Sequence, residues 1–439
     1  MKKIEYFIKT VLCILIFSAC ESFIADDINL DPNNPGSVTL NAILPSIQIR
    51  IMDVYGGQTS RVNSMFAQQT EGVARQWSSF NDYSGLTPVR FNTVWDIHYE
   101  KVLIEVNKMI EDASTDGYSH YAAAGQVLKA AALMNMTDWW GDIPYSTAAL
   151  GIDDINPTYD SQSSIYVSIF SLLDSASALF NGPDGGLSLG GDDVIFKGDV
   201  SKWIKSINAL KARGHIHNGR YADALSAAKT SFTSRDDNMS YKFAVTQQAG
   251  WWRFNDGRTG DIEFHPFLRN LMTNLNDTDR LSVWDQTFIT NHPYLKADYD
   301  QALISYREIQ FIIAECLKRT NGSESEMETA YLNGIQASFA DSGLTDAQYN
   351  TYVGQTAVNP GGSSLDLETH ILTQKYIGLF VQPEVFNDLR RNDFPVLTPT
   401  SGTSIPVRWN YSGDELLFNE NAPAEGSTTL FKPKNSWDN

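Results

Sequence analysis

Apolar side chains recur at steps of three and four residues along most of the chain, and this spacing is typical of amphipathic helices. The clearest case is residues 94–113, where Val102, Val106 and Ile110 follow one another at i+4 between charged positions. The same kind of pattern predicts helices over residues 44–54, 62–77, 118–136, 161–179 and 201–217. The chain is therefore expected to be largely helical.

A glycine separates the helix over 201–217 from a further predicted helix. Gly219 follows the helix over 201–217, and Tyr221, Ala224 and Ala228 then fall on one face of the next helix. Small residues at these steps let two helices approach closely, as in the second half of a tetratricopeptide repeat. We expect this pair to serve as a scaffold and not as a peptide groove.

A second helical pair is predicted over residues 303–319 and 325–342. Ala330, Gly334 and Ala337 give the second helix of this pair a stripe of small residues for close packing. The pairs do not recur at a fixed period, so a continuous solenoid is not expected. The prediction is an all-α fold in which tetratricopeptide-like helix pairs form a scaffold, with few short strands.

Two long stretches lack the helical spacing. Residues 241–298 are expected to be a loop-rich insertion, and residues 393–439 are rich in Pro, Gly and Asn. Long irregular stretches in a compact protein usually serve a function. We therefore expect the first stretch to form a ligand-binding face and the second to wrap over the helices.

The N-terminus has the pattern of an export signal. Basic Lys2 and Lys3 precede the apolar run of residues 11–17, and Ser18 and Ala19 lead directly to Cys20. A cysteine at this place resembles a bacterial lipobox, in which the thiol is acylated and becomes the new N-terminus. The alternative is an ordinary signal peptide with an incidental cysteine. The apolar run is too short to span a bilayer, and no later segment is expected to span one.

These boundaries divide the chain into three parts. A signal peptide is expected over residues 1–19, an acidic tether over 20–36, and a single helical domain over 37–439. The chain has 33 Lys and Arg against 52 Asp and Glu, which argues against a nucleic-acid partner. Of its three cysteines, Cys13 leaves with the signal and Cys20 is acylated, so Cys316 is expected to be buried and unpaired.

Sequence motifs for catalysis or metal binding are absent. The chain has no His-Glu-x-x-His, Cys-x-x-Cys, phosphate-binding loop or Gly-x-Ser-x-Gly. His215 and His217 are two residues apart, so on a helix they point in different directions. The paired aspartates at 153–154, 192–193 and 236–237 lack a calcium-binding loop pattern and are expected to be solvated surface. No catalytic residue, metal or cofactor is predicted.

Aromatic residues in or beside the predicted loops are the stronger candidates for function. A flat ring suits the C–H face of a sugar, while nearby Asn, Asp and Arg can bond the hydroxyl groups. The alternative is that these rings fill the core beneath the loops, and for Trp139 and Trp140 we favour packing. The predicted ligand-binding residues are Trp77, Tyr83, Trp251, Trp252, Trp284 and Trp409.

Four motifs together resemble the SusD/RagB family of outer-membrane nutrient-binding lipoproteins. The first is the lipobox followed by Asp31-Pro32-Asn33-Asn34-Pro35. The others are Asp138–Tyr145, Ser305–Glu308 with Ala314-Glu315, and Gln374–Phe380 running on to Glu384 and Asp388–Arg391.

The resemblance implies an all-helical fold and a lipid-anchored location on the cell surface at the outer membrane. It also implies a partner, a SusC-like TonB-dependent outer-membrane barrel, to which captured oligosaccharides are delivered. Arg390 and Arg391 are expected to bridge helix ends and carboxylates. Two alternatives stay open: a RagB-like protein that captures peptides, and a lipid-anchored glycoside hydrolase.

Overall fold

The computed structural model describes residues 38–149, 155–285, 292–361, 366–424 and 426–438. The predicted signal peptide, Cys20 and the tether over 20–36 therefore lie outside the described residues. Within the described chain, helices dominate, and the predicted all-α fold is confirmed.

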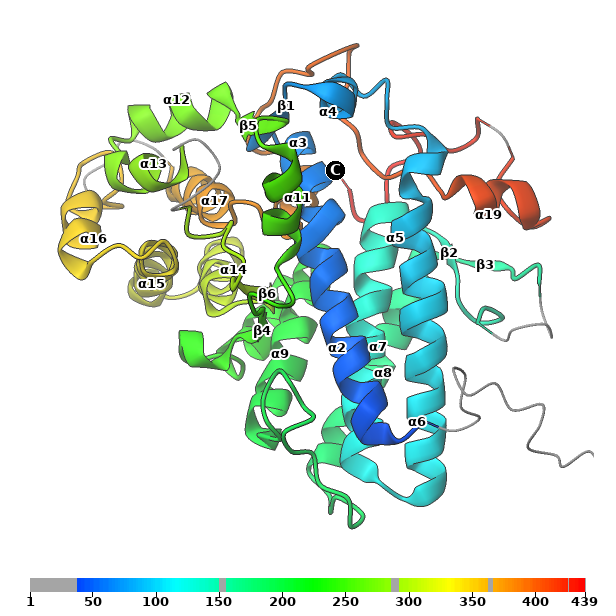
Figure 1. The fold of residues 1–439 in the computed structure, drawn as a ribbon. Coiled ribbons are helices and arrows are strands. Elements are labelled where there is room, and N and C mark those ends of the chain that lie inside the picture. Colours follow the sequence, from blue (N-terminus) through cyan, green and yellow to red (C-terminus); the bar gives the residue numbers. More distant parts are fainter. Residues whose placement is uncertain (1–37, 150–154, 286–291, 362–365, 425, 439) are drawn as a thin grey trace, which may run out of the picture.

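Long helices of the first half stand side by side in Figure 1. The predicted helix over 94–113 is confirmed as a continuous run of α5 (Asn92–Asp96), the π-helix η4 (Ile97–Leu103) and α6 (Ile104–Asp116). Helix α6 packs against its neighbours in the bundle, which also pack on one another. These neighbours are α2 (Leu40–Val54), α7 (Ser119–Trp140) and, beyond α7, α8 (Gln162–Phe180).

The two predicted helix pairs are confirmed in the second half. The first pair is α9 (Val200–His217) with α10 (Tyr221–Lys229), and the second is α14 (Tyr306–Arg319) with α15 (Glu324–Asp341). Gly334 permits the close approach in the second pair, because a Cβ there would lie 2.9 Å from the Phe311 ring. Helices α16 (Asp346–Val353), α17 (Leu367–Gly378) and α18 (Glu384–Asn392) follow.

Three short antiparallel strand pairs connect distant parts of the chain. They are β1 (Thr70–Gly72) with β5 (Ile262–Phe264), β2 (Ile143–Pro144) with β3 (Tyr159–Asp160), and β4 (Met239–Lys242) with β6 (Asp300–Ile304). One large apolar core runs through the molecule, and a smaller cluster lies among α14, α15, α16 and α17.

The predicted helix over 62–77 was wrong. The chain forms α3 (Ser60–Phe66), then β1, then α4 (Arg75–Asn81). Gln68, just after α3, and Arg75, the first residue of α4, both have a φ of 52°, and this left-handed backbone interrupts the predicted helix. The helix predicted from residue 303 begins only at Tyr306, because residues 300–304 pair with β4 and Ser305 caps the helix.

The segment over 241–298, which we predicted to be loop-rich, carries several short elements. Besides β5 they are α11 (Gly250–Arg258), α12 (Pro266–Asn274) and α13 (Thr278–Trp284). Short helices also interrupt other irregular stretches: η3 (Pro88–Phe91), η6 (Arg235–Asp237) and α19 (Gly413–Phe418). These helices are short and rich in polar residues, so their apolar residues show little periodicity. Sequence spacing alone therefore does not reveal them.

Helix α8 is the one helix of the described chain that is long and apolar enough to cross a membrane by length and composition. Our expectation that no such segment follows the signal was therefore too strict. The helix packs against α7 and α9, and serines such as Ser163, Ser164 and Ser171 lie on its exposed side. In the folded chain one side of α8 is apolar and buried and the other side is polar and exposed, so the helix forms part of the bundle.

A buried ionic cluster joins α7, α9 and α18. His217 Nε2 lies 2.6 Å from Glu384 Oε1, and its Nδ1 lies 3.3 Å from Asp138 Oδ2. The Tyr166 hydroxyl donates a hydrogen bond to Asp138, and the side-chain amide of Asn387 donates one to Glu384 over 2.9 Å. Burial by itself would lower the pKa of His217. The negative charges of Glu384 and Asp138 outweigh this effect and raise the pKa to about 9. The imidazole is therefore held as a cation between two carboxylates.

A second buried cluster joins α14, α17 and α18. Arg391 binds Glu315 in bidentate fashion, over 2.6 and 2.8 Å, and donates to Asp388 over 2.7 Å. Lys375 lies 3.3 Å from Glu315 and 2.8 Å from Asp388. Burial raises the pKa of Glu315, but Arg391 and Lys375 together hold it far below its usual range. Cys316, next in the chain, is fully buried and unpaired, as predicted.

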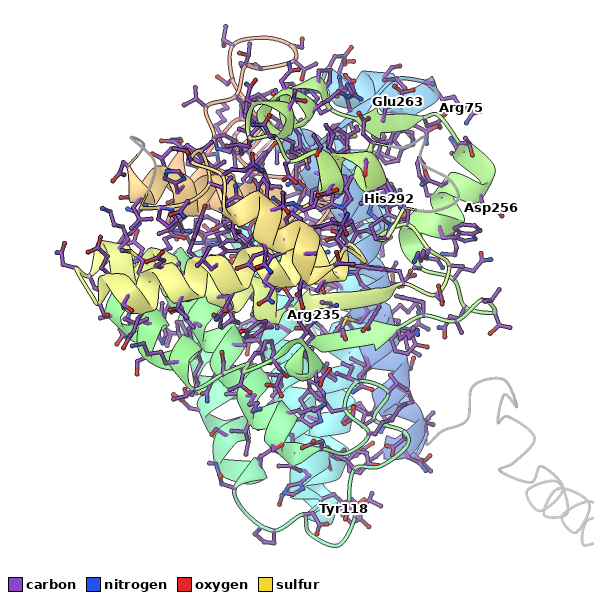
Figure 2. All side chains as sticks on the ribbon, turned by 90° about the vertical axis from the view of Figure 1, so that its left-hand side faces the viewer. Arg75, Tyr118, Arg235, Asp256, Glu263 and His292 are labelled. Carbon is purple, nitrogen blue, oxygen red and sulfur yellow. The ribbon has the colours of Figure 1, made fainter. Side chains whose placement is uncertain are left out.

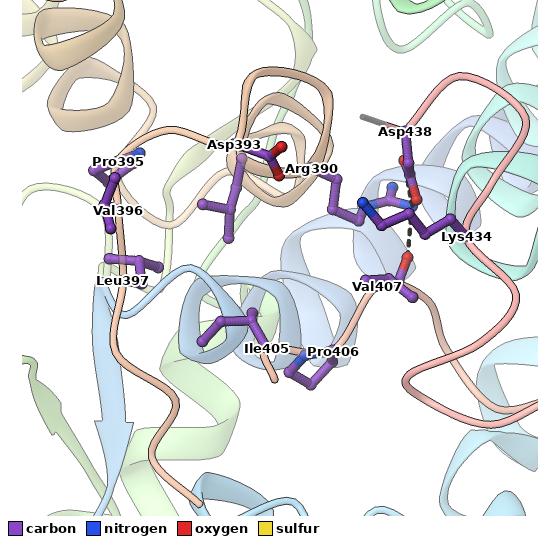
Figure 3. A pocket seen from close by; sticks show the side chains of 11 residues that line it. Arg390, Asp393, Pro395, Val396, Leu397, Ile405, Pro406, Val407, Lys434 and Asp438 are labelled. Carbon is purple, nitrogen blue, oxygen red and sulfur yellow. Dashed lines mark hydrogen bonds and ion pairs between the residues drawn. The ribbon is translucent and has the colours of Figure 1, made fainter. Parts of the chain in front are cut away.

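Arg390 ties the C-terminal segment to the helices. It donates to the backbone oxygens of Asp138 and Val407 over 2.7 and 2.9 Å, and it lies 3.4 Å from Asp438. Figure 3 shows Arg390 between Val407 and Asp438. The Trp437 ring stacks on His217 with 5.1 Å between ring centroids. The prediction that the paired arginines bridge helix ends is confirmed, and the predicted wrap of the C-terminal stretch over the helices is confirmed for its described residues, 393–424 and 426–438.

Removing Arg391 should strongly destabilise the fold. The variant Arg391→Ala leaves Glu315 buried with only Lys375 and Arg319 near it, and breaking such a buried pair costs about 3–5 kcal/mol. The control Arg220→Ala breaks an exposed pair with Asp223, so its cost should stay below about 1 kcal/mol. Urea unfolding measures both. Equal midpoints for the two variants would contradict the role of the buried cluster.

The His217 cluster should make the free energy of unfolding fall as the pH rises into the alkaline range. The folded pKa of about 9 exceeds the usual 6.5, so the contribution of His217 is complete below pH 6.5 and is lost as pH rises through 9. The stability difference between the wild type and His217→Gln should thus shrink by on the order of 3 kcal/mol between pH 6 and pH 10. Urea unfolding across this range measures it. His120→Gln, on a partly exposed histidine, should show no such trend.

Candidate ligand-binding face

Helix α11 lies on a distorted part of the α2–α3 rod (Figure 1). Between α2 and α3, residues Tyr55–Thr59 form the π-helix η2, in which Gly57 departs from helical geometry. Gly250 opens α11 directly against it, because a Cβ at Gly250 would lie 2.7 Å from Gly57 Cα. Two glycines thus allow backbone to meet backbone, and this contact fixes where α11 begins.

Arg61 anchors the aromatic side of α11 from below. Its guanidinium lies 4.6 Å from the ring centroid of Phe254 and 5.7 Å from those of Trp77 and Trp251. Its Nη1 donates to the backbone oxygen of Gly250 over 3.0 Å. Burial lowers the pKa of Arg61 to about 9, and Asp53 partly offsets this effect. The cation therefore joins α3, α4 and α11 into one aromatic cluster.

Of the six aromatics predicted to bind a ligand, Trp77 and Trp251 come together in this cluster. Both are buried, with 4% and 2% exposed surface, and Trp251 Nε1 donates to Ser60 Oγ over 2.7 Å. Trp252, the next residue on α11, is only partly buried. Of the six residues Trp252 is the most exposed, although its Nε1 is buried, so it is the member that a ligand can reach most readily.

The other three predicted aromatics lie apart from α11. Trp284 is fully buried and stacks on Phe380, with centroids 4.8 Å apart. Trp409 is fully buried against Trp139, Trp140 and Phe91, and its Nε1 donates to Asn63 Oδ1. Tyr83 is 8% exposed and contacts the half-exposed Phe431. A ligand role for these three requires that the covering loops move, and it stays a prediction.

Polar side chains surround the exposed side of α11. Arg253 pairs with Asp53, and Arg258 donates to Gln76 over 2.8 Å. Arg75 pairs with the buried Asp261 over 2.7 Å. Asp256 is exposed on the same helix. The face thus combines one accessible indole with donors and acceptors, which is the chemistry that a polyhydroxylated ligand needs.

A carboxylate pair at this end of the molecule gave no signal in the sequence. Glu71 and Glu263 lie directly opposite each other on β1 and β5. Burial raises the pKa of Glu71, the charge of Glu263 raises it further, and Arg269 opposes both. Figure 2 shows Glu263 and Arg75 at the upper end of the molecule, with Asp256 lower on the same side. Only the strand pairing brings these two glutamates together, since 192 positions separate them in the sequence.

The predicted acidic loops are structural where they are described. Asp193 is buried and accepts hydrogen bonds from Gln48, Trp203 and three backbone amides. Asp237 pairs with Lys205. The expectation that these two aspartates are solvated surface was wrong, because both carboxylates are buried and bind neighbouring groups of the protein. Among the described residues, no group of three or more His, Cys, Asp or Glu is arranged to hold a metal ion.

A small cavity of about 210 Å³ lies beside the C-terminal segment (Figure 3). Its lining includes the apolar residues Pro395, Val396 and Ile405 and the charged residues Arg390, Asp393, Lys434 and Asp438. The Arg390 guanidinium already donates to the backbone oxygens of Asp138 and Val407. The arginine that lines the cavity is thus already bound within the protein.

Comparisons with known proteins agree with this architecture. Residues 32–293 and 282–412 match the SusD-like family model described as starch-binding and associating with the outer membrane. No protein with a curated function matches the sequence.

Several solved structures share the fold. A SusD/RagB family protein from Bacteroides thetaiotaomicron is 21% identical, with a TM-score of 0.73 over 88% of this chain and 95% of its own. A SusD-like protein of Bacteroidetes AC2a is 19% identical, with a TM-score of 0.75 over 91% of this chain and 100% of its own. A chitin-binding protein is 23% identical, with a TM-score of 0.71 over 87% of this chain and 94% of its own.

The glycine contact beneath α11 generates a prediction. Gly250→Ala places a Cβ 2.7 Å from Gly57 Cα, so α11 should shift outward and the fold should lose about 1–3 kcal/mol. Hydrogen exchange along α11 should accelerate. The matched control is Gly257→Ala in the same helix, where nothing lies within 4 Å, and it should leave exchange slow. Unchanged exchange in both variants would mean that the glycine contact does not position α11.

Proposed function

Because the chain belongs to the SusD-like family of starch-binding proteins that associate with the outer membrane, we propose that it captures oligosaccharides at the cell surface. In this proposal it is a lipoprotein anchored through Cys20, and it delivers its cargo to a SusC-like TonB-dependent outer-membrane barrel. It binds the glycan without cleaving it.

The accessible indole on α11 is the observation that best supports glycan capture. Trp252 is partly exposed and lies between Trp251, which is locked in the core, and Arg253 at the surface. An indole face packs on the C–H face of a pyranose, and charged neighbours such as Arg253 and Asp256 bond its hydroxyl groups. The fold likeness to a chitin-binding protein supports the same class of ligand.

The anchored location rests on the N-terminal sequence pattern. Several acyl chains on Cys20 give firm attachment, because a single chain holds a protein only marginally at a membrane. The acidic tether over 20–36 then separates the domain from the lipid surface. A surface lipoprotein needs a transporter to move its cargo inward, and the barrel partner supplies that step.

A glycoside hydrolase is the second candidate, and one observation favours it. Glu71 and Glu263 face each other across β1 and β5, and paired carboxylates are what glycoside hydrolysis uses. The charge of Arg269 opposes the raised pKa of Glu71, and Arg269 is itself paired with Asp285, so a structural cluster of charges is the simpler account. Product release from a soluble glycan that is abolished by Glu263→Gln would establish the enzyme and overturn the proposed function.

Trp252→Ala should weaken glycan binding without loss of stability. Maltoheptaose and chitohexaose are the probes, and titration calorimetry measures their affinity. Loss of one stacking indole should lower the affinity roughly tenfold, since such contacts are worth about 1–2 kcal/mol.

The control is Phe418→Ala, which removes another exposed ring, on α19, far from α11 in Figure 1. Its affinity should equal that of the wild type. If neither sugar binds the wild type but a peptide library does, the alternative of peptide capture replaces glycan capture.

A further inference from the structure

A polar cavity of about 410 Å³ lies beside the strand pair β4–β6, which also contacts α2. Its size falls within the range of roughly 300–1,000 Å³ that is common for small-molecule sites. It is lined by η6, by the strand pair β4–β6 and by the junction of α14 with the end of α15. Figure 2 shows Arg235 beside these strands, on the face toward the viewer.

Two arginines share one carboxylate in this cavity. Arg235 Nε binds Asp341 Oδ1 over 2.7 Å, and Arg307 Nη1 binds Asp341 Oδ2 over 2.9 Å. The arrangement leaves one net positive charge, because a single carboxylate balances two guanidinium groups. Asp341 thus positions both guanidinium groups side by side at the cavity wall.

The guanidinium group of Arg235 keeps unused donors. Arg307 is 3% exposed and also donates to Tyr294, and its Nε, which has no hydrogen-bond partner among the described residues, is buried and out of reach of a ligand. The Nη groups of Arg235 make no hydrogen bond to any described residue, and its side chain is 47% exposed. Paired guanidinium donors of this kind match the two oxygens of a carboxylate.

The rest of the lining supplies acceptors. Asp298, Asp300 and Asn238 line the cavity together with the exposed Lys242 and Lys296. Burial raises the pKa of Asp300, and a hydrogen bond from Ser240 opposes that rise. Carboxylate and amide oxygens of this kind accept hydrogen bonds from hydroxyl groups.

The charges of the lining balance, and this decides the class of ligand. Four cationic side chains face four carboxylates: Arg235, Lys242, Lys296 and Arg307 against Asp236, Asp298, Asp300 and Asp341. A compact anion such as phosphate would meet these carboxylates without compensation. A ligand with one carboxylate and several hydroxyl groups satisfies both sets of groups. We infer that this cavity binds a uronic acid unit of an acidic oligosaccharide, with its carboxylate on the exposed Nη groups of Arg235, beside Arg307.

This inference rests on the proposed function for its ligand class and adds a site separate from α11. It extends the cargo from neutral glycans to acidic ones. The chain as a whole carries a net charge of −19, so an acidic glycan needs such a local cationic fork to approach.

Titration calorimetry on the purified protein tests the inference with trigalacturonate, maltotriose and inorganic phosphate as probes. Trigalacturonate should bind the wild type, and Arg235→Ala should lower its affinity roughly tenfold or more, because charge-assisted hydrogen bonds are lost. The matched control Arg220→Ala removes another exposed arginine that pairs with an aspartate, and its affinity should not change. Lys296→Ala, at an exposed position, should weaken binding less.

Three outcomes overturn the inference: trigalacturonate does not bind, it binds Arg235→Ala as well as the wild type, or phosphate displaces it at equal concentration. Trp252→Ala separates this site from the α11 face, because it should leave trigalacturonate binding intact. If neutral glycans fail to bind while trigalacturonate binds through Arg235, the α11 assignment fails and the cavity assignment stands. If maltoheptaose binds and trigalacturonate does not, only the cavity assignment fails.

Discussion

The fold depends on the neutralisation of charges that it buries. Glu315 and Glu384 are each almost inaccessible to water, and an isolated carboxylate there would cost several kcal/mol. Arg391 and His217 cancel these charges, and each bond crosses between helices that lie far apart in the sequence. The helices can therefore close on one another only in the arrangement that brings these partners together. Such bonds define one packing, because an apolar core alone tolerates small shifts of helix against helix.

This constraint explains why the three sequence motifs within the described residues are spread over the chain and yet concern one place. The segments around Asp138, Glu315 and Asp388–Arg391 meet in the same buried region, where α7, α14 and α18 converge. Arg390 extends the region to the C-terminal segment, whose Trp437 closes over His217. The motifs therefore record the scaffold and not the ligand. Family membership follows from the scaffold, while in the proposed function the choice of cargo lies in surface elements that the scaffold supports.

Those surface elements are attached by different means. Helix α11 sits on the π-helix η2 through a glycine contact, and Arg61 fixes its aromatic underside. The cavity near Arg235 is held instead by one shared carboxylate, Asp341, at the end of α15. The α11 face and the cavity near Arg235 both present polar groups that rigid helices support. A ligand would therefore meet donors that are already oriented. The two sites differ in chemistry: one offers an indole face, and the other offers a guanidinium fork.

The amino-acid pattern alone determined most of the long helices and their pairing, because three- and four-residue spacing and small-residue stripes act locally. It also indicated the burial of Cys316, because a cysteine left without a partner is most simply a small buried hydrophobe. It also indicated the bridging role of Arg390 and Arg391. It missed the break between α3 and α4, where Gln68 and Arg75 take left-handed backbone that no composition signal marks. It also missed α11, whose glycines and charges hide a helix that tertiary contacts hold in place.

Whether a ring is exposed was decided by the tertiary structure alone. Trp252 and Trp284 look alike in the sequence, yet one reaches the surface and the other stacks on Phe380, from another part of the chain. The cavity likewise joins Arg235, Arg307 and Asp341 across more than a hundred positions. Sequence spacing reports the face of an element on which a side chain lies. Burial and proximity depend on which other elements cover that face, and only the folded chain fixes them.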